Sequence, residues 1–350
     1  MKDNYKIKVY LTKESFEDII VFDDEYPNLN HIFRESATFI FDMTEDELDG
    51  LLDDIKSDFA MFCNSHNIKT IAKESVLNHM LTDKDELIKN CRSLFIMDID
   101  EQEARKIREE NGVLVLSKDN IDDNVFNQRF WRHRFVKNTA IKGNSITEWG
   151  DVLKDMPWLP LNSIVIFDDY IFAESNVTLK DCVENVKGLL DAILPPKLAI
   201  DFHVLILTTH PNCDEAKRNQ IVGDIKSYIQ SKRNYKIRLE FIFYKSLHQR
   251  KIITNYNVMV GDKGFVNFNN KSKKIIDDNP TYACTVFQNI VNSIGDTEYG
   301  MATRDLEKIY KLSEIVKEMN VNGIKNYTKK IVGDCTKGKT INNRLLKSIV

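Results

Sequence analysis

Three features that often identify the environment of a protein are missing from this 350-residue sequence. Its longest purely apolar stretches, such as 163–167 and 204–207, are far shorter than the roughly 20 residues of a membrane helix. The first residues contain no apolar core of the signal-peptide type. The six cysteines include no CxxC pair and no metal-ligand spacing. We therefore expect a cytoplasmic protein with reduced thiols, no membrane contact, no metal site and no cofactor.

The sequence does have a strong separation of charge. Residues 1–100 carry 11 Lys and Arg against 22 Asp and Glu, a net charge of −11. Residues 201–350 carry 25 against 15, a net charge of +10. The C-terminal half therefore suits a phosphate backbone, which the N-terminal half would repel. An alternative of equal standing is that the two halves attract each other or a second copy of the chain.

Short apolar runs alternate with helix-period segments along the chain, which is typical of an α/β protein. In the first part, the runs 37–42, 93–98 and 112–117 predict strands, and charged helices follow the first two. Between about 124 and 160 the pattern loosens into a connecting segment that contains all three tryptophans. The sequence therefore predicts an acidic α/β domain of uncertain family over residues 1–155.

The second part shows a more regular order of elements, β-α-β-α-β-β-β. The apolar positions between Leu179 and Ile193 recur at steps of three and four, which predicts an amphipathic helix. We expect an α/β domain over residues 156–298 and a basic helical extension over 299–350. The predicted strands are 162–172, 202–210, 236–244, 250–256 and 258–268, and the predicted helices are 179–193 and 214–230.

The stretch "LHQRKIITNYNVMVGDKGF", residues 247–265, follows the third of these strands. It contains His248, Arg250 and Asn255. This pattern and the preceding strand-helix alternation resemble the HxKxxxxD signature of the phospholipase D superfamily over residues 160–270. The resemblance implies that His248 attacks phosphorus and that Arg250 holds the phosphate in place of lysine. Asn255 stands where the signature has aspartate, and it carries no charge.

The chain contains no second HxK or HxR motif with this spacing. A working site would therefore need two copies of the chain across a twofold axis, as in single-motif members of the superfamily, and this predicts a homodimer. The alternatives are a binding or assembly module in a nucleic-acid-associated system, without turnover, and a strand that only happens to carry a histidine. The altered motif favours the module over the phosphodiesterase or nuclease.

Basic residues interleaved with aromatic residues suit backbone neutralisation with base stacking. The segment "NQRFWRHRF", residues 127–135, has this composition. A solvated surface without a ligand is the other interpretation. The residues predicted to contact phosphate or nucleic acid are Arg132, Arg134, Arg250, Lys251 and Lys263.

Acidic residues at the ends of predicted strands offer a different chemistry. Asp98, Asp100 and Asp168 are the residues that a Mg²⁺-dependent phosphoryl enzyme would use. Helix capping explains Asp42 and Asp100 without a metal, because each stands just before a predicted helix. "GDCTKGKT", residues 333–340, matches the P-loop pattern, but only ten residues follow it, and its flanks predict two short helices around a turn.

Overall fold

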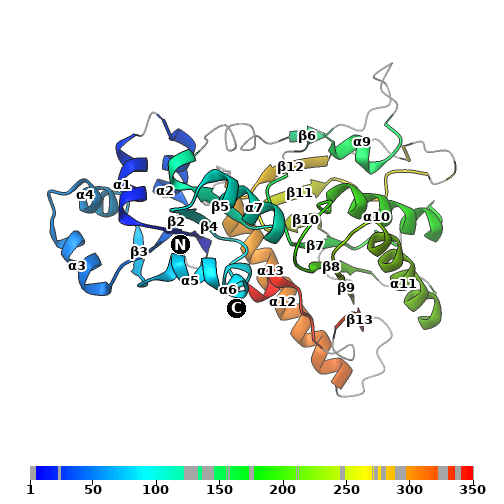
Figure 1. Cartoon of the computed structure of the whole chain (residues 1–350). Coiled ribbons are helices and arrows are strands. Elements are labelled where there is room, and N and C mark those ends of the chain that lie inside the picture. The colour runs from blue at the N-terminus through cyan, green and yellow to red at the C-terminus, as the bar shows by residue number, and fades with distance from the viewer. Residues whose placement is uncertain are drawn as a thin grey trace. The chain divides into compact units, whose positions relative to one another are not determined.

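The computed structural model divides the chain into two compact units, each built around its own β-sheet (Figure 1). The N-terminal unit contains residues 1–131, 285–304 and 349, and the C-terminal unit contains residues 132–284, 305–348 and 350. The residues that the structure describes are 5–22, 25–121, 133–135, 146–154, 156, 158–172, 177–209, 211, 213–244, 249–269, 271, 275–276, 281–287, 297–321, 330–335 and 340–349.

The N-terminal unit is a doubly wound α/β fold. Its five strands are parallel in the order β3-β2-β1-β4-β5, so the strand order reverses between β1 and β4. Strands β2, β4 and β5 are buried along their whole length, as expected when helices cover both faces. The strands are β1 Ile7–Leu11, β2 Ala37–Phe41, β3 Lys69–Ala72, β4 Leu94–Met97 and β5 Leu114–Ser117.

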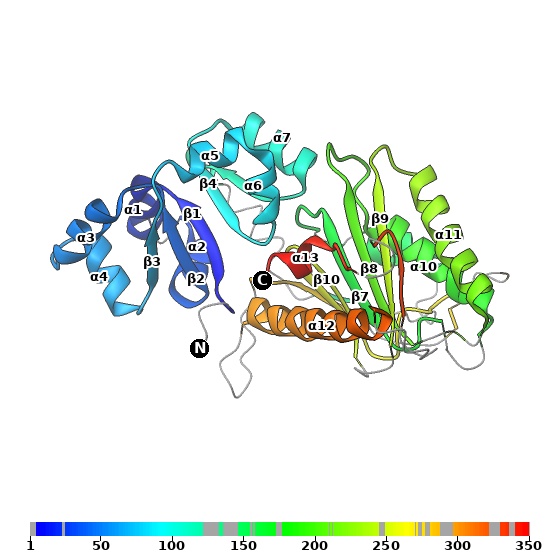
Figure 2. The same cartoon turned by 90° about the horizontal axis from the view of Figure 1, so that it is seen from below.

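Aromatic side chains fix the helices to this sheet. Phe16 packs edge-on against Phe39 and Phe41 of β2, with ring centroids 5.0 and 5.3 Å apart. On the opposite face, Tyr10 of β1 stacks on Phe95 of β4 at 5.0 Å. Helices α1 to α4 cover the first face and α5 to α7 the second (Figure 2). The helices are α1 Lys13–Val21, α2 Pro27–Glu35, α3 Glu45–Asp53, α4 Asp58–Ser65, α5 Val76–Thr82, α6 Lys84–Lys89 and α7 Glu101–Asn111.

The C-terminal unit contains an eight-stranded mixed sheet in the order β13-β9-β8-β7-β10-β11-β12-β6. The central strands β7, β8 and β9 are parallel, and antiparallel strands flank them: β10 beside β7, and β13 beside β9. Strands β10 and β11 form a hairpin. The strands are β6 His133–Phe135, β7 Ser163–Asp168, β8 Phe202–Thr208, β9 Ile237–Phe243, β10 Arg250–Thr254, β11 Asn257–Gly261, β12 Thr281–Thr285 and β13 Lys330–Gly333.

Alternate residues of the central strands point to opposite faces of this sheet. Ile164, Val204 and Leu239 belong to the apolar core under α10 and α11, on what we call the α10 face. Ser163 and His203 point to the other side, the α13 face. The helices of this part are α9 Trp149–Leu153, α10 Leu179–Ile193, α11 Glu215–Ser231 and α13 Arg344–Lys347, together with α12 Glu298–Val321, whose first residues, up to 304, belong to the N-terminal unit.

The predicted α/β fold class is confirmed, and so is the order β-α-β-α-β-β-β, which the structure realises as β7-α10-β8-α11-β9-β10-β11. Strands β1, β3, β6, β12 and β13 were not predicted. In the described part of the chain, none of the helices combines the length and the apolar composition that crossing a bilayer requires.

The division into units differs from the predicted domains. The segment before β7 was predicted to belong to the acidic domain of residues 1–155. It belongs instead to the C-terminal unit, because Trp149 of α9 is 1% exposed in the core under α10. Residues 299–350 are not a separate helical extension. Strand β13 pairs with β9, α13 contacts β7, and residues up to 304 belong to the N-terminal unit. The segment expected to form a helix before the P-loop-like pattern thus contains an antiparallel edge strand.

Candidate phosphate-binding site

The carboxyl ends of β7, β8 and β9 lie at one edge of the C-terminal sheet, which is where open α/β sheets commonly bind ligands. Asp168 ends β7, Thr208 ends β8, and Arg250 begins β10 directly opposite Asp168. Their side chains point to the α10 face. We call Asp168, Tyr170, Thr208, Arg250 and Asp262 the carboxyl-edge site.

Arg250 is the cation of this site. Its Nη1 donates to the carbonyl oxygen of Asp262, and its guanidinium lies 4.9 Å from the centroid of the Tyr170 ring. Among the described residues Arg250 forms no ion pair with a carboxylate, and its buried Nε has no hydrogen-bond acceptor. The guanidinium is therefore held in place while it keeps donors for an anionic ligand.

Thr208 adds a second unsatisfied group in the same row of the sheet. Its Oγ1 is buried and has no hydrogen-bond partner among the residues that the structure describes. Buried hydroxyl groups nearly always have a partner in folded proteins. The carboxyl-edge site therefore contains a cation and a fully buried hydroxyl without a partner among the described residues.

Asp168 has a structural role at this edge, because it accepts hydrogen bonds from the backbone. It is 1% exposed, and its two oxygens accept from the backbone N–H groups of Tyr170 and Phe265, each at 2.9 Å. The second bond holds the turn after β11 against the end of β7. Gly264 in that turn has φ +115°, and a Cβ there would lie 2.9 Å from Asp168 Oδ2. The turn therefore needs glycine both for its backbone conformation and for its contact with Asp168.

We expect Gly264→Ala to lower the free energy of unfolding by about 2 kcal/mol, since the added Cβ meets Asp168 and the positive φ disfavours an L side chain. Urea denaturation measures the change. Gly223→Ala is the matched control, because a Cβ there meets nothing within 4 Å and alanine favours the α11 helix. Equal stability of the two variants would contradict this account of the turn.

Asn255 lies at the other end of β10, five residues of extended chain and roughly 16 Å from Arg250. It is fully buried. Its Oδ1 accepts from the backbone N–H groups of Asn162 and Ser163 at 3.1 and 3.2 Å, and its Nδ2 donates to Asn162 Oδ1. The structure thus gives Asn255 a structural role at the start of β7, and it does not bring Asn255 together with Arg250.

The remaining predicted contacts are dispersed. Lys251 points to the α13 face, where it forms an ion pair with Asp305 of α12 at 2.5 Å, so its charge is already neutralised. Lys263 is exposed in the turn after β11. Arg134 lies in β6 opposite Tyr282, and its side chain is outside the description. His248 and Arg132 lie outside the described residues.

The acids proposed for Mg²⁺ are likewise separate. Asp98 forms an ion pair with Lys118 at 2.9 Å, and Asp100 caps α7 by accepting from Glu103 N–H. Asp42 accepts from two N–H groups at the start of α5. Asp168 belongs to the other unit. In the part of the chain that is described, no three His, Cys, Asp or Glu side chains are grouped so that they would hold a metal ion.

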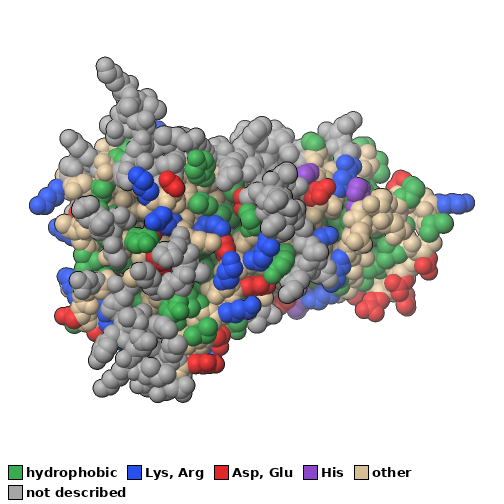
Figure 3. Space-filling model, turned by 180° about the vertical axis from the view of Figure 1, so that it is seen from behind, with side chains coloured by type: hydrophobic (Ala, Val, Ile, Leu, Met, Phe, Trp, Pro, Cys, Tyr) green, Lys and Arg blue, Asp and Glu red, His purple; other side chains and the backbone are tan. Residues whose placement is uncertain are grey.

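Acidic side chains of the N-terminal unit gather at α3 on the face that Figure 3 shows. Glu45, Asp46 and Glu47 occupy its first turn, and Figure 3 shows Asp and Glu side chains gathered at the lower right, where α3 lies. Elsewhere on the face shown, Lys and Arg side chains lie among acidic and apolar ones. On this face a local site, rather than a continuous basic stripe, is therefore the better candidate for phosphate contact.

Sequence reasoning identified Arg250 but missed Tyr170, Thr208 and Asp262. The turn signal "GDKGF" predicts a tight connection after β11, but it does not show that the connection returns to Asp168. Comparison with known proteins adds no assignment, because no protein-family model matches the sequence and no curated protein matches it significantly.

Proposed function

We propose that the C-terminal unit is a phospholipase D-like binding module that recognises a phosphate group of nucleic acid at the carboxyl-edge site. The observation that carries this proposal is the state of Arg250, which the Tyr170 ring and the Asp262 carbonyl hold in place and which forms no ion pair with a carboxylate among the described residues. A guanidinium placed in this way binds phosphate oxygens through two parallel N–H donors. The excess of Lys and Arg over residues 201–350 favours the same class of ligand.

Two features favour binding without turnover. Asn255 is bonded into the start of β7, so the motif does not place its third residue beside Arg250. Asp168 is the carboxylate closest in register to Arg250, and both of its oxygens already accept backbone N–H groups. Asp168 is therefore committed to the backbone and is not placed to protonate a leaving group.

Arg250→Gln is expected to weaken binding of a fluorescein-labelled single-stranded oligodeoxynucleotide of about 20 nucleotides by roughly tenfold, since a charge-assisted contact to phosphate is lost. Fluorescence anisotropy over a series of salt concentrations measures the affinity. The salt dependence should fall by about one released counterion. Arg105→Gln on α7, with a side chain 71% exposed, is the control of equal charge change.

Unchanged affinity in Arg250→Gln, or an equal loss in the Arg105 control, would remove the carboxyl-edge site from the proposal. Arg250→Lys separates charge from geometry. It keeps the charge but not the paired donors, so an intermediate affinity is expected.

The alternative function is a homodimeric, metal-independent phosphodiesterase with His248 as the nucleophile. The observation in its favour is that Arg250, two residues after His248, lies at the edge where α/β sheets bind ligands. The test is hydrolysis of a chromogenic phosphodiester and of single-stranded DNA in EDTA, with His248→Ala as the control and light scattering for the oligomeric state. Turnover by a dimer that His248→Ala abolishes supports the enzyme. Activity that requires Mg²⁺ and survives the substitution supports the acidic residues instead.

A further inference from the structure

The α13 face of the central strands carries polar side chains from the amino ends of β7 and β8 to the middle of β9. Ser163 of β7, His203 of β8 and Glu240 of β9 all point to this face, and Asp201 precedes β8 beside them. Glu240 is 2% exposed. Sheet faces inside proteins are usually apolar, as the α10 face is here. These polar groups therefore need partners from whatever covers them.

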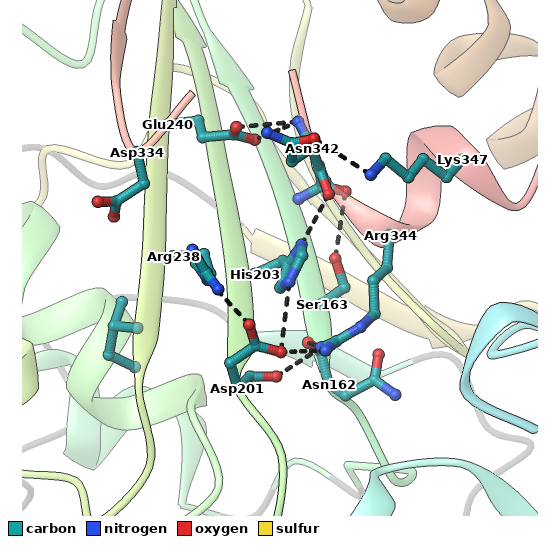
Figure 4. Close-up of polar contacts among 12 residues, drawn as sticks. Asn162, Ser163, Asp201, His203, Arg238, Glu240, Asp334, Asn342, Arg344 and Lys347 are labelled. Atoms are coloured by element: carbon teal, nitrogen blue, oxygen red, sulfur yellow. Dashed lines mark hydrogen bonds and ion pairs between the residues drawn. The ribbon is translucent and has the colours of Figure 1, made fainter. Parts of the chain in front are cut away.

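Their partners come from residues 340–348, which we call the C-terminal segment. Figure 4 shows the backbone of Asn342 between two side chains of the sheet. The Asn342 N–H donates to the Glu240 carboxylate at 2.9 and 3.1 Å, and the Asn342 carbonyl lies 2.8 Å from His203 Nδ1. Because a carbonyl only accepts, Nδ1 carries the proton and donates.

The next two residues are recognised through their side chains. Asn343 is fully buried, accepts from Ser163 Oγ at 3.1 Å and donates to the Ile164 carbonyl at 3.1 Å. Arg344 donates to the carboxylate and the carbonyl oxygen of Asp201 (Figure 4). Leu345 and Leu346 then bury their side chains.

These contacts have the form of peptide recognition rather than of sheet extension. Side chains of the sheet bind the backbone of one residue and the side chains of the next two, and the described contacts of the segment include no strand pairing. The Asn343 side chain also accepts from Leu345 N–H, so the segment folds its own first helical turn. If the segment left, water would form hydrogen bonds with the polar groups that it uncovers. An apolar face offers water no such hydrogen bonds.

We propose that the α13 face of β7, β8 and β9 is a peptide-binding site, and that the C-terminal segment is its separable ligand. The chemical class of the ligand is a short peptide with the sequence Asn-Asn-Arg-Leu-Leu, residues 342–346. The same segment of a second copy satisfies the same contacts, so the site also links two copies by exchange of the segment. This inference does not depend on phosphate binding at the carboxyl-edge site.

The experiment starts from the full, folded chain with a specific protease site inserted after Lys339. After cleavage, a fluorescein-labelled peptide of residues 340–350 is added, and anisotropy follows its binding. Saturable binding that the uncleaved chain does not show is expected. Arg344→Ala in the peptide should weaken binding at least tenfold because it loses Asp201, and Asn343→Ala should do the same. Ser348→Ala is the matched control, because its Oγ bonds only within the segment and its affinity should stay unchanged.

A substitution in the sheet tests the other side of the contact. Asp201→Asn in the cleaved chain should weaken the wild-type peptide at least tenfold and reduce the effect of Arg344→Ala. Two results overturn the proposal. One is a cleaved chain that keeps its own segment and exchanges none of it over a day. The other is loss of folded secondary structure on cleavage, which would show that the segment is an inseparable part of the core.

Discussion

Asn255→Ala is expected to lower the free energy of unfolding by about 3–4 kcal/mol while leaving the carboxyl-edge site in place. The substitution leaves the N–H groups of Asn162 and Ser163 without their acceptor in a fully buried position. It also removes the donor to Asn162 Oδ1. Each unsatisfied buried group costs about 1–3 kcal/mol. Urea denaturation followed by circular dichroism measures the loss, and Asn219→Ala, on the exposed side of α11, is the control of equal chemistry.

Asn255→Asp separates a structural role from a catalytic one, because it restores the aspartate that the phospholipase D signature has at this position. An aspartate keeps both N–H bonds, and the Asn162 amide can rotate to donate to it, so we expect a smaller loss of stability than with alanine. We expect no gain in phosphodiester hydrolysis, since position 255 lies at the far end of β10 from Arg250. Hydrolysis that appears in Asn255→Asp would contradict the structural role.

The contrast between Arg250 and Asn255 shows what the sequence was able to predict. Period and turn signals predicted β7 to β11 in the correct order, and with them the start of β10 where Arg250 lies. The partner of Asn255 is Asn162, 93 positions earlier in the chain. Only the pairing of β7 with β10 brings the two together, and a local pattern does not contain that information.

Long-range contacts also explain the other differences. Lys251 resembles a phosphate contact in the sequence, but Asp305 of α12 neutralises it. The sequence of the basic C-terminal residues resembles that of a free extension. In the structure, β13 pairs with β9 at the edge of the sheet, and the C-terminal segment contacts the α13 face of strands far away in the sequence. Strand β1 was missed because Lys8 interrupts its apolar residues, although its position in the middle of the sheet buries Ile7, Val9 and Leu11.

Glu240→Gln is expected to stabilise the chain by about 3 kcal/mol at pH 8 and to have little effect at pH 4.5. Burial raises the pKa of Glu240 from 4.5 to about 7, against the opposing effects of the Asn342 N–H bond and of Lys347. Asp334 raises this pKa further. A shift of about 2.5 pKa units corresponds to about 3 kcal/mol. Glutamine keeps an acceptor for the Asn342 N–H and has no charge to bury.

The sign follows from proton binding by the folded and unfolded chains. Between pH 4.5 and about 7 the folded chain keeps a proton on Glu240 that the unfolded chain has lost, so the free energy of unfolding decreases as the pH rises through this window. Above this window the folded chain must bury an ionised carboxylate. The advantage of Glu240→Gln should therefore grow from pH 4.5 to about 7 and then stay constant.

The difference between variant and wild type isolates this group from its titrating neighbour. Burial lowers the pKa of His203, so below pH 6.5 this imidazole destabilises the fold as the pH falls, and it does so equally in both chains. Urea denaturation of both chains from pH 4.5 to 8 measures the difference. A stability difference that does not change with pH would show that Glu240 is not buried against the C-terminal segment as described. It would also remove the carboxylate from the contacts that hold Asn342 in the peptide-binding site.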